Sequence, residues 1–136
     1  PREQSDRDKS PPIRFGPFAV CAATIAVLSL TPNPRQTQMV GILEMVGGEL
    51  WAHGVAWAAL GLAARWARVT REDTGRASAL AWCVCVGYGV LMESLQYFVP
   101  GRGAQVVDLL ADAAGTTAGV VLMNMWMNRS RDHEQA

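Results

Sequence analysis

Six polar side chains that could bind a ligand or carry chemistry lie near the ends of long apolar segments. They comprise an imidazole, three carboxylates, an amide and a guanidinium, namely His53, Glu93, Gln96, Arg102, Asp108 and Asp112. Imidazole and carboxylate groups serve in proteins as general acids and bases and as metal ligands. Because burial of such groups costs free energy unless they are paired, we expect them to have partners or a function.

The spacing of the carboxylates indicates that they share helix faces with other polar residues. Glu93 and Gln96 stand three positions apart, and Asp108 and Asp112 stand four apart, so each pair lies on one side of a helix. A charged side chain at the centre of a bilayer costs at least about 2.5 kcal/mol. We therefore predict that these carboxylates face a neighbouring helix and not lipid, and that they pair with His53 or with Arg102.

Two glycines continue the face of the second acidic pair. Gly115 and Gly119 follow Asp112 in a G-x-x-x-G step, which permits close approach of two helices. We predict that both glycines are helix-packing positions.

Three interpretations of the six side chains remain open. The first is a structural network of hydrogen bonds and ion pairs that holds helices together. The second is a binding site for a polar head group or a small ligand. The third is a metal or hydrolytic site that uses His53, Glu93, Asp108 and Asp112. Because the chain has no H-E-x-x-H motif and no glycine-rich phosphate loop beside a strand, we expect no enzyme activity, no metal and no cofactor.

The elements that position these side chains are apolar. Half of the 136 residues are hydrophobic and 18% are charged, whereas a typical soluble domain has about 25% charged residues. A helix that crosses a bilayer core needs about 20 apolar residues, with a lower limit near 17. Residues 15–30 and 77–92 lack the polar face that a soluble bundle requires. We predict an all-α integral membrane protein with four transmembrane helices, at residues 15–30, 50–69, 77–99 and 106–127.

Polar segments flank the predicted membrane domain, which covers residues 15–127. Residues 1–14 and 128–136 are predicted to be polar tails. Apolar residues at helical spacing in 35–48 predict a short amphipathic helix after the first span. Since no basic stripe with interleaved aromatic residues occurs, we expect no nucleic acid as a partner. The predicted spans lead us to expect membrane lipids and other membrane subunits as partners.

The basic residues predict the orientation in the membrane. Of the 12 arginines and lysines, only Arg35 and Arg102 lie in the first and third connections between spans, and the others lie in the tails or around the second connection. Since basic residues concentrate on the cytoplasmic side, both termini should be cytoplasmic. This orientation places His53, the carboxylates and Gln96 near the outer surface. We expect no comparable polar group in the inner halves of the helices.

The residues from 93 to 119 resemble the signature of VanZ-like membrane proteins. That signature reads approximately E-x-x-Q-x-F-x-P-x-R, followed by D-x-x-x-N-x-x-G-x-x-x-G. It matches Glu93, Gln96, Phe98, Pro100, Arg102, Asp108, Gly115 and Gly119. The family's asparagine is Asp112 in this chain. Its earlier D-K-x-x-H motif is similar to residues 49–53, with Glu49 for the acid, Leu50 for the lysine and His53 retained.

The resemblance leaves the function open between two main hypotheses. We favour a non-enzymatic accessory subunit packed against a larger membrane complex, for example a respiratory or photosynthetic one, in which a partner would hold the polar tails. The alternative is a stand-alone envelope protein that binds a lipid-linked or lipophilic molecule at the outer leaflet. The resemblance implies this alternative, because the family name comes from resistance to teicoplanin-type glycopeptides. Both hypotheses place the protein in a bacterial inner membrane.

Overall fold

The structure is a computed structural model that describes residues 15–32, 48–68, 74–100 and 105–134. Within these ranges the chain forms four α-helices and no strand, which confirms the all-α prediction. The helices are α1 (Gly16–Leu30), α3 (Gly48–Ala67), α4 (Thr74–Gln96) and α5 (Val106–Glu134). The amphipathic helix predicted at 35–48 lies almost wholly outside the described residues, and Arg102 also lies outside them.

Local sequence signals set several helix ends. Pro17 lies in the first turn of α1, where the missing amide hydrogen has no helical acceptor to lose. α4 ends at Gln96 in a turn, in which the amide of Val99 donates to the Gln96 carbonyl at 2.9 Å, and Pro100 follows. α5 begins with Asp108 in its first turn, where a carboxylate complements the positive end of the helix dipole.

α5 continues to Glu134, beyond the predicted end of the last span at Met127. No glycine or proline lies between these two positions to end the helix. The Ser130 hydroxyl donates to the Trp126 carbonyl at 3.1 Å and so adds no competing turn. The described part of the predicted carboxyl tail is therefore a continuation of α5.

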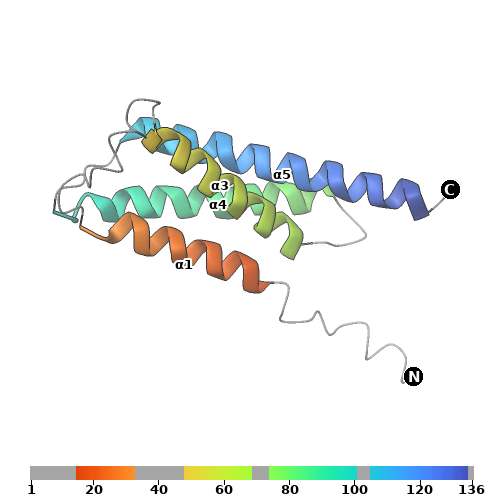
Figure 1. Ribbon diagram of the computed structural model, residues 1–136, viewed down its shortest axis with the longest axis horizontal. Helices are drawn as coiled ribbons and strands as arrows, with labels where there is room; N and C mark the ends of the chain where they lie inside the picture. The colour runs from red at the N-terminus through yellow and green to blue at the C-terminus, as the bar shows by residue number, and fades with distance from the viewer. Residues whose placement is uncertain (1–14, 33–47, 69–73, 101–104, 135–136) are drawn as a thin grey trace, which may run out of the picture.

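The four helices run alternately up and down, so that the end of α1, the start of α3, the end of α4 and the start of α5 meet at one end of the molecule (Figure 1). α3 and α5 form the most extensive contact, and α1 packs on α3 and α4. This antiparallel order brings the second turn of α3, the last turn of α4 and the first turns of α5 together. We call this end of the bundle the site end.

Glycines allow α3 and α5 to approach closely. A Cβ atom added at Gly119 would lie closer than 3.0 Å to backbone atoms of Ala58, and one added at Gly115 would lie closer than 3.0 Å to the Gly54 carbonyl oxygen. A Cβ at Gly61 would lie 2.6 Å from the Thr116 carbonyl oxygen. The backbones of α3 and α5 are therefore in direct contact, as in small-residue packing of membrane helices.

The apolar core lies between all four helices and contains an aromatic stack. Trp57 is almost fully buried, and its ring stacks on His53 at 5.9 Å and on Tyr88 at 6.3 Å between centroids. The Tyr88 hydroxyl donates to the Ala22 carbonyl at 2.6 Å, which ties α4 to α1. The stack thus fixes the orientation of the His53 ring from its apolar side.

Two helices are long and apolar enough to cross a membrane, α4 over Thr74–Gln96 and α5 over Val106–Ser130. In both helices most of the apolar window is not buried inside the molecule, since 28% and 44% of it are buried. A soluble protein would cover such surfaces, whereas lipid can face them directly. α1, with 15 residues, is a shorter apolar helix.

Candidate functional site

The site end is organised around a hydrogen bond between α3 and α5. His53 Nδ1 lies 2.8 Å from Asp112 Oδ1, and the Asp112 side chain is 1% exposed. Because an ionised carboxylate only accepts hydrogen bonds, Nδ1 carries the proton in this pair. The close α3–α5 contact at Gly115, one turn below Asp112, places the two side chains within reach.

Glu93 joins α4 to the start of α5. Its Oε2 accepts a 3.0 Å hydrogen bond from the backbone amide of Gln105, the residue before α5. The side chain is 7% exposed. Gln105 was not among the residues predicted from the sequence, because its contribution is a backbone amide, which every residue except proline has.

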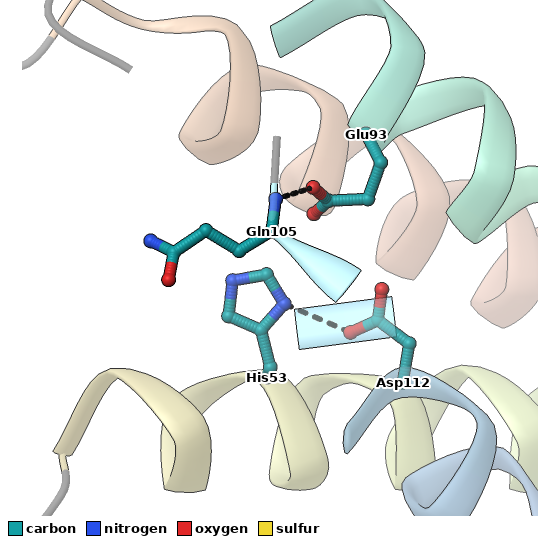
Figure 2. A network of polar contacts seen from close by, with 4 residues as sticks. All are labelled: His53, Glu93, Gln105 and Asp112. Atoms are coloured by element: carbon teal, nitrogen blue, oxygen red, sulfur yellow. Dashed lines mark hydrogen bonds and ion pairs between the residues drawn. The ribbon is translucent and has the colours of Figure 1, made fainter. Parts of the chain in front are cut away.

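His53, Glu93 and Asp112 form one cluster. One nitrogen or oxygen atom from each lies within 4.8 Å of the corresponding atoms of the other two. The His53 ring, the Glu93 carboxylate and the Asp112 carboxylate lie at three corners of the cluster, and the dashed line joins His53 to Asp112 (Figure 2). The second oxygen of Asp112, Oδ2, is buried and has no hydrogen-bond partner among the described residues. A buried carboxylate oxygen without a hydrogen-bond partner either lowers the stability of the fold or marks a position where a ligand binds.

The remaining predicted site residues are placed differently. Gln96 and Asp108 are buried at the same end of the bundle, but neither side chain makes a hydrogen bond within the described part of the chain. The buried Nε2 of Gln96 has no partner there. Arg102 lies outside the described residues, so its predicted pairing with the carboxylates stays a prediction.

A cavity of about 170 Å³ adjoins the cluster on the side of α1. His53 forms part of its wall, together with Ala52, Ala56 and Trp57 of α3 and with Ile25, Leu28 and Ser29 of α1. The lining is mainly apolar, with His53 and the buried Ser29 as polar groups. No sequence pattern predicts this cavity, because it depends on how α1 lies against α3.

A second polar network lies at the opposite end of the bundle and links three helices. Arg65 of α3 is fully buried, and its Nε donates to Asn124 Oδ1 of α5 at 2.7 Å and to Ser78 Oγ of α4 at 3.1 Å. Its Nη1 donates to the Arg68 carbonyl at 2.9 Å. Asn124 Nδ2 in turn donates to Ser78 Oγ at 2.9 Å.

This network contradicts the expectation that the helices hold no polar cluster comparable to that of His53 and the carboxylates at their other end. Arg65 lies in the last turn of α3, next to the second connection, where an arginine normally extends into solvent. The structure instead turns Arg65 inward. Its partners Ser78 and Asn124 lie on other helices, and a single sequence cannot show which residues on separate helices meet.

Comparison with known proteins gives one match. No curated protein and no solved structure matches this chain significantly. The family model described as VanZ/LLP1 matches residues 13–127, a range that includes every described helix up to the last turns of α5. The match confirms the resemblance to VanZ-like proteins and, with the two apolar helices, indicates a membrane protein. Since the match covers most of the chain, this protein belongs to the VanZ/LLP1 family.

Proposed function

We propose that this VanZ-like protein binds an amphipathic molecule, such as a lipid-linked compound, at one surface of the membrane, and that it does so without catalysis. One observation supports this proposal above the others. His53 lines the apolar cavity on one side and bonds to the buried Asp112 on the other. A single side chain therefore joins an apolar compartment to a polar cluster, the arrangement that an amphipathic molecule requires.

The size of the cavity defines which part of the molecule it would hold. Its volume of about 170 Å³ is well above the ~15 Å³ that one water requires. It is below the ~300 Å³ at which pockets enclose a drug-sized ligand. We propose that it holds the segment next to the polar head, while the rest of the apolar chain stays in lipid beside the exposed faces of α1 and α3.

The proposed setting is a bacterial inner membrane that all four helices cross, with both termini in the cytoplasm. The distribution of arginines and lysines supports this orientation and places the site end at the outer leaflet. α1 with 15 residues is about 22 Å long. A span shorter than the bilayer core is accommodated by local thinning at a modest cost.

Purification from native membranes, followed by native mass spectrometry, tests the binding proposal. Ala56→Leu adds apolar atoms to the cavity wall, whereas Ala59→Leu adds the same atoms to an exposed position on the same helix. We expect the wild type and Ala59→Leu to retain the same amphipathic molecule. Ala56→Leu should retain about tenfold less of it, equivalent to about 1.4 kcal/mol. Equal retention by both variants would remove the support for a ligand in this cavity.

A second candidate function is that of a non-enzymatic accessory subunit of a larger membrane complex, for example a respiratory or photosynthetic one. A groove of about 410 Å³ between α3 and α5 favours it. Small residues such as Gly54, Ala58, Ala114 and Ala118 line this groove, and small residues let a partner helix approach closely. Copurification in mild detergent tests this candidate. Elution of the wild-type chain free of other subunits would count against it, as would unchanged copurification of Ala114→Leu.

A further inference from the structure

We propose that His53, Glu93 and Asp112 together bind a divalent transition-metal ion of the Zn²⁺ or Mn²⁺ class. The cluster offers one nitrogen and two carboxylate groups from three different helices, with the ligand atoms within 4.8 Å of one another. The sequence leaves a metal site open as one of three interpretations but favours none, and it is the geometry of the cluster that argues for an ion here. The inference concerns the same cluster as the proposed function, but it holds whether or not an amphipathic molecule binds.

Two carboxylate oxygens of the cluster are not used by the hydrogen bonds within it. Glu93 uses Oε2 for the Gln105 amide, which leaves Oε1 available. Asp112 uses Oδ1 for His53, and its buried Oδ2 has no partner among the described residues. Figure 2 shows the His53 ring and the carboxylates of Glu93 and Asp112 converging from three helices, and one ligand atom of each lies within 4.8 Å of the other two. A bound ion would take the place of the proton between Nδ1 and the Asp112 carboxylate.

The charge balance at the site end also favours a cation. Glu93, Asp108 and Asp112 are each at most 7% exposed. In the described ranges, the only side chain that forms an ion pair with any of them is His53. Among the described residues, these three buried carboxylates therefore share one imidazole, and buried negative charge without a partner is costly. A dication offsets two of these charges directly.

The type of ion follows from the ligand set. Oxygen-only sites suit Ca²⁺ and Mg²⁺, whereas imidazole nitrogen together with carboxylate oxygen suits Zn²⁺ and Mn²⁺. Ligand atoms on one tetrahedral Zn²⁺ lie about 3.3 Å apart, so the longest separation in the cluster must shorten by about 1.5 Å. Rotation about the side-chain bonds of Glu93 can supply a shift of this size. Three protein ligands leave one position open, which an oxygen of a polar head group could fill.

Metal analysis of the full chain tests the proposal. The protein is purified in detergent, stripped with chelator, incubated with Zn²⁺ or Mn²⁺ and desalted, and bound metal is then measured by mass spectrometry. We expect one ion per chain for the wild type and for Asp132→Asn, an exposed carboxylate on α5. Glu93→Gln and Asp112→Asn should each weaken binding at least tenfold. Wild-type protein without metal, or variants that bind as tightly as the wild type, would overturn the proposal.

A spectroscopic measurement keeps the test decisive if those variants fail to fold. Co²⁺ added to the stripped wild type should give visible absorption bands of a nitrogen and oxygen site. These bands should persist in His133→Ala, because His133 is the only other histidine in the chain. Their absence in the wild type, or their loss in His133→Ala, would contradict the assignment to His53. Both metal experiments are independent of lipid binding, so a negative result in them leaves the proposal of amphiphile binding standing. Likewise, a negative result in the ligand-retention experiment leaves the metal proposal standing.

Discussion

The hydrogen bond from His53 Nδ1 to Asp112 Oδ1, 2.8 Å long, connects α3 to α5 at a depth where the acceptor is 1% exposed. It connects residues 59 positions apart in the chain. On one side of it lies the cavity against α1, and on the other lies Glu93. The pair is therefore the link between the apolar and the polar parts of the candidate site.

The first prediction concerns the energetic coupling of this pair. His53→Ala and Asp112→Ala should each lower the free energy of unfolding by about 1–3 kcal/mol, because each leaves a buried polar partner unsatisfied. The double variant should be more stable than the sum of the single effects predicts, with a coupling of at least about 1 kcal/mol. Unfolding in mixed micelles measures all four proteins of the cycle. Strict additivity would show that the pair does not hold α3 and α5 together.

The second prediction concerns the contact between the backbones of α3 and α5. Gly119→Ala should destabilise the protein by about 1–3 kcal/mol, because the new Cβ meets backbone atoms of Ala58, which cannot rotate away. Gly87→Ala on α4 is the matched control, since nothing lies within 4 Å of its added Cβ. That substitution should be neutral or should stabilise by up to about 1 kcal/mol. Thermal unfolding in detergent distinguishes the two, and similar effects of both would refute the close packing.

The third prediction concerns the polar network at the opposite end. Arg65→Ala removes the donors to Asn124 and Ser78 and should lower the free energy of unfolding by about 1–3 kcal/mol, the range for leaving buried polar partners unsatisfied. Arg129→Ala changes the same residue type at an exposed position on α5 and should change stability by less than about 0.5 kcal/mol. Denaturation midpoints measure the difference. If Arg65→Ala changed stability as little as Arg129→Ala, the network around Arg65 would not stabilise the fold.

The sequence identifies which polar residues belong to the site, but not which groups they bond to. His53, Glu93 and Asp112 stand out because few polar residues occur in these apolar segments, and the structure brings all three together. The partner of Glu93 is a backbone amide, which no side-chain pattern can reveal. The burial of Arg65 has no sequence signal, because an arginine at the end of a span is normally a surface residue.

The spatial arrangement of helices limited the rest of the prediction. The all-α fold followed from the length and composition of the apolar segments. The cavity against α1 did not, because α1 carries apolar residues on every side and its sequence therefore marks no contact face. The composition predicts where the apolar span ends, at Met127, but not that the helix continues to Glu134, because polar residues such as those of 128–134 are compatible with either helix or tail.

The fourth prediction concerns orientation in the membrane. In a background without the three native cysteines, Tyr97→Cys places a thiol at an exposed position next to the site end, and Ser130→Cys places one near the opposite end of α5. A membrane-impermeant maleimide should label Tyr97→Cys in intact cells, because the proposed orientation turns the site end outward. It should label Ser130→Cys only in inverted vesicles. Labelling in the reverse pattern would invert the proposed topology.

The central claim, that the cavity beside His53 receives a specific amphipathic molecule, is tested most directly by photo-crosslinking in native membranes. A diazirine side chain is placed at Leu28, which lines the cavity, or at its neighbour Val27, which does not. The two positions are matched in exposure, at 64% and 65%. We predict one distinct crosslinked amphipathic species at Leu28, against a mixture of bulk phospholipids at Val27. The same bulk mixture at both positions would contradict the account.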